Sequence, residues 1–175
     1  MREQLNLTEQ DGYEALQGHL AERAYQARQN YPDLANEAAV RRLLADPEVV
    51  RFPTAMIFDT KFLIPGEFAH AEPRGDKASD GFVLVVHPHF KERWEDLPYL
   101  VSYHIPSINY LDVATHREAE LFGAILMGME KEAYYKKICD LADELGPVPG
   151  AEFLSETGLA PETSTSACCG GDHCS

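Results

Sequence analysis

Apolar residues recur at helical spacing near the start of the chain. Intervals of three and four positions, which place side chains on one face of a helix, separate Tyr13, Leu16, Leu20, Ala24 and Ala27. Thr8 followed by Asp11 has the pattern of a helix N-cap with an acidic residue in the first turn. Because Pro32 disfavours helical geometry at the residue before it, we expect this helix to end near Asn30. A second helix is predicted over residues 34–45.

The pattern then changes to short runs rich in β-branched and aromatic residues. Runs of this kind predict strands, and they occupy residues 52–58, 61–64, 67–71, 82–86 and 99–105. The first two runs lie close enough to predict a hairpin, and the polar residues 72–81 predict an exposed loop. The run FVLVV at 82–86 is continuously apolar, which is typical of a buried strand.

A helical pattern returns towards residue 146. Thr115 and Glu118 match a capping box, in which hydroxyl and carboxylate each bind a free backbone N–H group. Residues 121–129 are apolar on nearly all sides, so we expect this segment to be central and buried. A Gly-Pro pair at 146–147 predicts the end of the helical region. The pattern leaves open whether residues 116–145 form one helix or two.

Together these elements predict an α+β protein with one folded domain, residues 1–146. We expect a small, largely antiparallel sheet of about four or five strands, packed with the N-terminal helices and the long C-terminal helical segment. Residues 147–167 contain few large apolar groups and predict a flexible linker. Residues 168–175 form a cysteine-rich tip at the end of the predicted tail.

Charge narrows the range of partners. The chain carries 29 acidic and 15 basic residues, a formal net charge of −14. Such a surface repels phosphate backbones and anionic lipids, so we expect neither nucleic acid nor a membrane surface as a partner. A metal ion or a basic protein is attracted instead. The N-terminus has no apolar signal-peptide core, and the longest apolar run, 121–129, is too short to span a bilayer, so we predict a cytoplasmic protein.

The densest reactive chemistry lies in the tip, CCGGDHCS. Three of the four cysteines and one histidine fall within seven positions, as Cys168, Cys169, His173 and Cys174. In a reducing compartment, clustered thiols indicate metal ligands or redox groups rather than structural disulfides. Thiolates and imidazole are the ligands of a tetrahedral soft-metal site, with zinc expected first and iron, copper or nickel as alternatives. The spacing is not that of a zinc finger, so thiol redox chemistry and contact with a partner protein stay open as other roles.

The tip resembles the C-terminal vicinal cysteine pair with which mercuric reductases pass metal to their active site. This similarity covers two or three residues of the tail, and nothing in residues 1–146 resembles that flavoenzyme, so it carries no function over. A tethered tip nevertheless has a high effective concentration, about millimolar for a short flexible link. We therefore expect it to collect an ion from a donor protein and pass it to a second site on this chain or on an acceptor protein.

Five of the seven histidines lie between positions 70 and 116, where a second site is predicted. His87 and His89 follow the strand at 82–86, and residues two apart on an extended strand point to the same side. The candidate ligands of this body site for zinc, iron or nickel are Glu67, His70, His87, His89 and His104. His116 and Glu120 share one helix face and are the weakest candidates. Acid–base chemistry without metal, or ordinary hydrogen-bonded histidines, would explain the same residues.

These observations favour a cytosolic metal-binding protein whose tip captures or transfers a soft transition metal. The alternative is a metal-dependent enzyme with a His/carboxylate centre in residues 67–120 and a redox-active thiol tail. A third possibility is a binding module whose acidic body docks a partner. The chain has no phosphate-binding loop, no dinucleotide fingerprint and no nucleophile elbow. No catalytic residue follows from the sequence, and whether the protein is an enzyme stays open.

Overall fold

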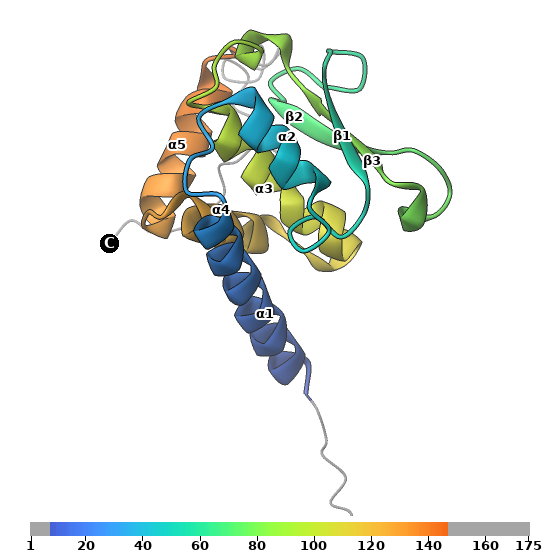
Figure 1. Cartoon of the computed structure of the whole chain (residues 1–175), viewed down its shortest axis with the longest axis vertical. Coiled ribbons are helices and arrows are strands. Elements are labelled where there is room, and N and C mark those ends of the chain that lie inside the picture. Colours follow the sequence, from blue (N-terminus) through green and yellow to red (C-terminus); the bar gives the residue numbers. More distant parts are fainter. Residues whose placement is uncertain (1–7, 147–175) are drawn as a thin grey trace, which may run out of the picture.

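Five α-helices and three strands make up the part of the chain that the computed structural model describes, residues 8–146 (Figure 1). In chain order they are α1 (Glu9–Asn30), α2 (Glu37–Ala45), β1 (Thr54–Phe58), β2 (Ala69–Pro73), β3 (Phe82–Val86), α3 (Leu97–Tyr110), α4 (His116–Met127) and α5 (Lys131–Asp143). Short 3₁₀ turns at Ala78–Asp80, Pro88–Phe90 and Leu111–Val113 connect some of them. The predicted α+β class is confirmed.

Helix α1 forms where the sequence predicts it, and α2 begins at Glu37, three residues later than expected. Thr8 caps α1 with a reciprocal capping box to Asp11, and the helix ends at Asn30, before Pro32. Asn36 caps α2 by accepting the backbone N–H of Ala39 at 2.9 Å. Polar caps of this kind satisfy backbone groups that have no partner inside the helix. The capping side chains therefore set where each of these two helices begins.

The sheet is smaller than predicted and is mixed rather than largely antiparallel. Its strand order is β1-β3-β2, with β1 parallel and β2 antiparallel to β3. The expected strand at 61–64 is wrong, because these residues form turns instead. The Asp59 carboxylate accepts the backbone N–H groups of Thr60 and Lys61, at 2.7 and 3.1 Å, and this local bonding competes with pairing to β1. The chain then crosses β3 to reach β2, so β1 and β2 are not neighbours.

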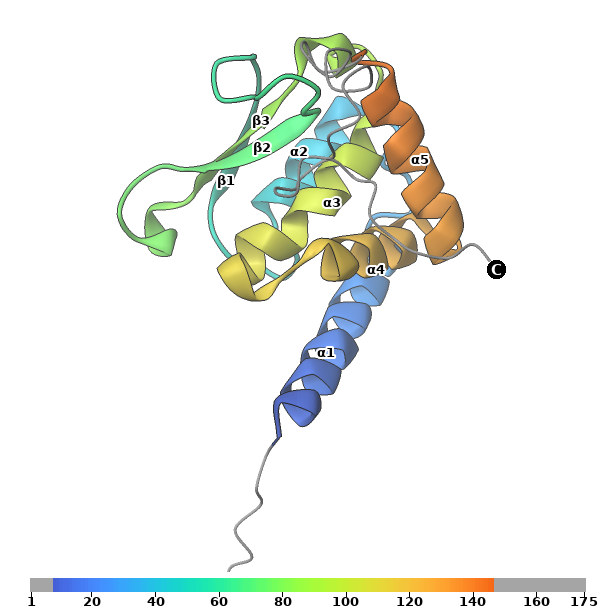
Figure 2. The same ribbon diagram turned by 180° about the vertical axis from the view of Figure 1, so that it is seen from behind.

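The largest correction concerns residues 99–105, which lie in α3 and not in a strand. Pro98 lies in the first turn of this helix, where proline is tolerated because its missing N–H group has no helical partner. The helix even continues through Pro106. Figure 2 shows α3 between the sheet and α4, and a helix buried on opposite sides carries a nearly continuous apolar run. Such a run looks like a buried strand when only the sequence is considered.

The helical segment 116–145 consists of two helices. α4 begins at the predicted Thr115 capping box and ends at Gly128, whose φ of 69° is left-handed and ends the helix. α5 then turns back against α4 and packs Tyr134 onto Gly123. The Tyr134 hydroxyl donates to the Tyr99 carbonyl at 2.8 Å and lies 2.9 Å from Ser102 Oγ. This one side chain therefore joins α5 to α4 and α3.

The core lies between the helices and one face of the sheet. α3 packs against β2 and β3, and α2 packs against β1 (Figure 1). The strands contribute alternate residues to it, including Met56, Leu84 and Val86. No helix within residues 8–146 is both long and apolar enough to span a membrane.

We expect Gly123→Ala to destabilise the protein by roughly 2 kcal/mol, because the added methyl group would overlap the Tyr134 ring. Gly18→Ala is the matched control, since a Cβ at position 18 of α1 meets no atom within 4 Å. That control should be neutral or stabilising by up to about 1 kcal/mol. Urea denaturation measures both, and equal stabilities for the two variants would contradict the packing.

Candidate functional site

The predicted tip ligands, Cys168, Cys169, His173 and Cys174, lie outside the described residues, as does the predicted linker 147–167. The candidate residues of the body site, by contrast, all lie within the described part of the chain. The structure distributes its candidate residues over two places, one beside β2 and one beside the turn that follows β3.

The first group is centred on His70 of β2. Its Nδ1 atom lies 3.4 Å from Glu67 Oε1, and its Nε2 atom lies 3.4 Å from Glu72 Oε2. Glu67 belongs to the turn before β2, so it reaches the same ring as Glu72 from the other side. The Glu67 carboxylate also accepts the backbone N–H of Ile64 at 3.1 Å, which fixes the turn. Two carboxylates therefore flank one imidazole ring.

His104 of α3 is the buried neighbour of this group. Its ring packs edge-on against Phe68 and Tyr103, with ring centroids 5.6 Å apart in both cases. Part of the residue keeps contact with solvent, but its Nε2 atom is buried and has no hydrogen-bond partner in the described part of the chain. Burial, and to a smaller extent the nearby His70, lower the pKa of His104 to about 4. His104 is therefore neutral at physiological pH.

The second group contains His87 and His89. β3 ends at Val86, and Pro88–Phe90 form a 3₁₀ turn, so the two histidines are not on an extended strand as predicted. His87 Nδ1 instead accepts the backbone N–H of His89 at 3.2 Å, and the ring centroids lie 6.5 Å apart. Partial burial and the neighbouring His89 lower the pKa of His87.

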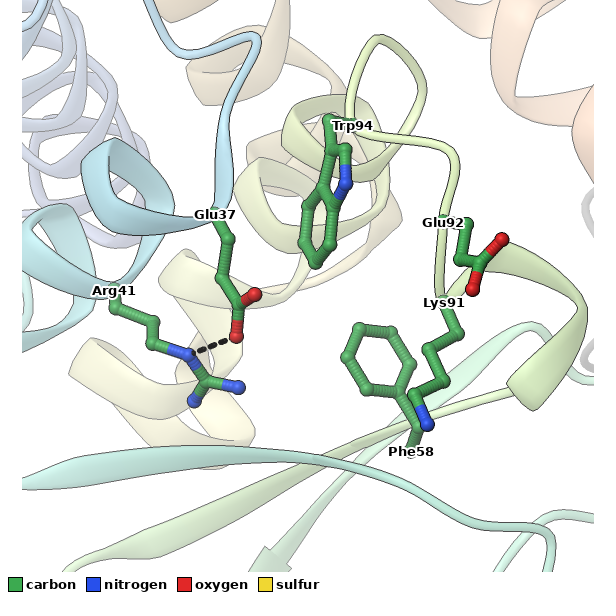
Figure 3. A pocket seen from close by; sticks show the side chains of 6 residues that line it. All are labelled: Glu37, Arg41, Phe58, Lys91, Glu92 and Trp94. Atoms are coloured by element: carbon green, nitrogen blue, oxygen red, sulfur yellow. Dashed lines mark hydrogen bonds and ion pairs between the residues drawn. The ribbon is translucent and has the colours of Figure 1, made fainter.

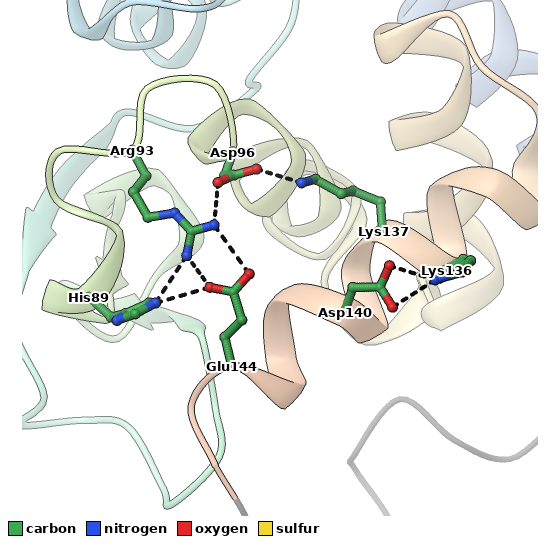
Figure 4. Close-up of polar contacts among 7 residues, drawn as sticks. All are labelled: His89, Arg93, Asp96, Lys136, Lys137, Asp140 and Glu144. Atoms are coloured by element: carbon green, nitrogen blue, oxygen red, sulfur yellow. Dashed lines mark hydrogen bonds and ion pairs between the residues drawn. The ribbon is translucent and has the colours of Figure 1, made fainter.

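His89 takes part in a charged network that joins the end of α5 to the loop before α3 (Figure 4). His89 Nε2 lies 3.1 Å from Glu144 Oε2, and the Arg93 guanidinium pairs with the same carboxylate and with Asp96. Lys137 of α5 lies 2.6 Å from Asp96. Hydrogen bonds from Arg93 and then His89 lower the pKa of Glu144 to about 2. Glu144 is therefore ionised near neutral pH, and the network holds α5 against the loop.

The sequence patterns did not indicate Arg93, Asp96 and Glu144 as members of a site. The only available signal was their charge, and Arg93 and Glu144 are 51 positions apart, too far for any helical or strand spacing to relate them. The network also explains His89 without a metal ion, because a carboxylate and a guanidinium already contact its Nε2 atom.

The two weakest candidates lie apart from both groups. His116 is exposed at the first turn of α4. Glu120 lies 3.2 Å from Lys131 at the start of α5, so its carboxylate joins two consecutive helices. Between residues 8 and 146, no three His, Cys, Asp or Glu side chains form a group that could hold a metal ion. The structure brings the candidate residues together in small sets and does not unite them in one ligand sphere.

An open groove of about 510 Å³ lies beside the loop that precedes α3 (Figure 3). The sequence did not indicate this feature. It lies between α2, the end of β1 and the loop before α3. Its lining residues are Glu37, Arg41, Phe58, Lys91, Glu92 and Trp94. It combines two aromatic rings with side chains of both charges, which suits a ligand that is part apolar and part charged.

Comparisons of the chain with protein-family models, curated protein sequences and solved structures find no significant match. The chemistry of the sites therefore has to be argued from their own residues.

The buried His104 predicts a specific pH dependence. The imidazole pKa is about 4 in the folded chain against 6.5 ordinarily, so between these values the unfolded state binds the proton more readily. Stability that is present above pH 6.5 is lost as pH falls towards 4, by up to about 3 kcal/mol. We expect His104→Gln to remove this part of the pH dependence in urea titrations.

The exposed His116 provides the control. His116→Gln should keep the wild-type slope of unfolding free energy against pH. If His104→Gln and wild type had parallel slopes from pH 7 to 4, His104 would not be held neutral by burial.

Proposed function

We propose that this chain is a cytosolic metal-binding protein that captures a soft transition-metal ion through Cys168, Cys169, His173 and Cys174. The observation that carries the proposal is the concentration of donors, with three thiols and an imidazole within seven positions. Residues 8–146 contain only Cys139, on α5. A random distribution of four cysteines over the chain would not gather three of them in this way.

The donor types define the ion. Thiolates with one imidazole bind zinc, and they also accept copper, iron or nickel. Gly170 and Gly171 separate the two halves of the tip and lack the side chains that would hinder a tight turn. Metal binding by thiols releases protons, so affinity should rise with pH. The cytosol supports this role because thiols stay reduced there.

Transfer of the ion to another protein or site is the second half of the proposal. The net charge of −14 attracts cations and basic partners and repels nucleic acid and anionic membranes. Donor and acceptor proteins that exchange metal with the tip are the partners we propose. The His70 group offers nitrogen and carboxylate donors, which are harder ligands than the thiols of the tip.

One observation favours the alternative function, a metal-dependent enzyme with its centre in residues 67–120. The His104 ring is neutral near neutral pH, and its Nε2 atom is buried and without a partner within the described residues. It lies near His70, which two carboxylates flank. A neutral imidazole is the form that binds metal. In this alternative the tip would be a redox-active accessory.

We expect substitution of Cys168, Cys169 and Cys174 by serine in the full chain to lower zinc affinity at least about 100-fold, because the ligating thiolates are lost. Anaerobic competition with a chromophoric chelator measures the affinity, and elemental analysis measures the bound metal. Cys139→Ser is the matched control and should bind zinc as wild type does.

Wild-type affinity in the triple serine variant would overturn the proposal. If metal stayed bound to that variant and was released by His70→Ala, the body site would be the metal centre and the alternative function would be favoured. Circular dichroism of each variant shows whether the fold is retained.

A further inference from the structure

Two aromatic side chains form the apolar part of the groove in Figure 3, and charged side chains lie on either side of them. Phe58, at the end of β1, and Trp94, in the loop before α3, have ring centroids 6.4 Å apart in an edge-to-face arrangement. Both rings are partly buried and pack against the core. Trp94 is the only tryptophan of the chain, so its fluorescence reports on this groove alone.

The charged side chains of the groove differ in how far they are already satisfied. Arg41 already has partners, since its Nε atom pairs with Glu37 at 2.6 Å and its Nη1 atom donates to the Met56 carbonyl at 3.1 Å. The Lys91 ammonium has no hydrogen-bond or ion-pair partner among residues 8–146. Of the two basic side chains of the groove, Lys91 is therefore the one that is free to receive a carboxylate, next to the aromatic pair. The groove is suited to an aromatic side chain with an acidic neighbour.

The residues that follow the described part of the chain include an aromatic side chain with an acidic neighbour. Glu144 pairs with Arg93, which directly precedes Trp94 in the loop that forms one wall of the groove (Figure 4). The described chain ends two residues after Glu144, at Gly146. Residues 147–175 follow, with four acidic residues and no lysine or arginine. The first large apolar residues among them are Phe153 and Leu154, preceded by Glu152.

Reach distinguishes this segment from the other terminus. Phe153 lies seven positions after Gly146, and an extended chain of seven residues spans about 23 Å. Residues 1–7 instead precede α1, whose 22 residues extend about 33 Å and whose first half projects away from the body (Figures 1 and 2). The first turn of α1 therefore lies on the far side of the molecule from the groove.

We propose that residues 151–154 of the same chain bind in this groove, with the Phe153 ring against Phe58 and Trp94 and the Glu152 carboxylate on Lys91. Attachment through α5 makes the binding intramolecular, which gives the segment a high effective concentration at the groove. The bound segment anchors the tail to the body before the thiol tip begins. This interaction involves no thiol and does not depend on the proposed metal binding.

The test compares the full chain with its Phe153→Ala variant through Trp94 fluorescence and acrylamide quenching. Removing the ring exposes the indole, so we expect a red-shifted emission and a quenching constant raised about twofold. Leu159→Ala, a truncation farther along the same tail, is the matched control and should leave both quantities as in wild type.

A charge exchange tests the second contact. Lys91→Glu should raise the quenching constant, and adding Glu152→Lys should restore the wild-type value, because the pair is re-formed with its signs reversed. Lys91 is exposed, so its substitution leaves the core intact.

Identical quenching of Trp94 in wild type and Phe153→Ala would overturn the proposal. So would a difference that disappears when the protein is diluted a hundredfold, because the occupant would then be the tail of a second copy. A concentration-independent difference, together with rescue by the charge exchange, supports intramolecular binding.

Discussion

Burial of α3 is the constraint on which the rest of this structure depends. A three-stranded sheet has too little surface to form a core by itself, and α3 supplies the apolar surface that covers one of its faces. Leu97, Leu100, Val101, Ile105 and Ile108 of this helix are fully buried. α4 and α5 then cover the side of α3 that faces away from the sheet, where Tyr134 joins the three helices through its ring and its hydroxyl.

The buried polar residues of α3 attach the surrounding segments to this centre. Asn109 accepts the backbone N–H of Arg51 at 2.7 Å and donates to the Val49 carbonyl at 2.8 Å, which fixes the segment between α2 and β1. Buried side chains of this type persist because their hydrogen bonds are made. His104 is the exception, since its Nε2 atom has no partner within residues 8–146. An unsatisfied buried nitrogen costs stability, so its presence is the strongest structural reason to test the neighbourhood of His70.

The loop between β3 and α3 carries residues of both the charged network and the groove. β3 and α3 hold its two ends, so Arg93 is placed to clamp Glu144 at the end of α5, and Trp94 to form one wall of the groove. The same loop thus borders both the exit of the C-terminal tail and a surface suited to an acidic, aromatic segment. In our proposals the tail carries soft-metal ligands at its end and is anchored to this loop near its start. Anchoring of this kind would keep the thiols close to the body without placing them in it.

Local chemistry in the sequence was enough to predict the helix caps at Thr8 and Thr115 and the buried strand at 82–86. These features depend on neighbours in the chain, and so does the concentration of donors at Cys168–Cys174, which no fold is needed to see. The sequence could not show that residues 99–105 are helical, because a continuous apolar run satisfies a buried strand and a buried helix equally well. Only tertiary packing decided that, when it placed α3 between a sheet and two helices. Tertiary structure also divided the histidines into two groups and paired Arg93 with Glu144, since contacts between segments 51 positions apart leave no period in the sequence.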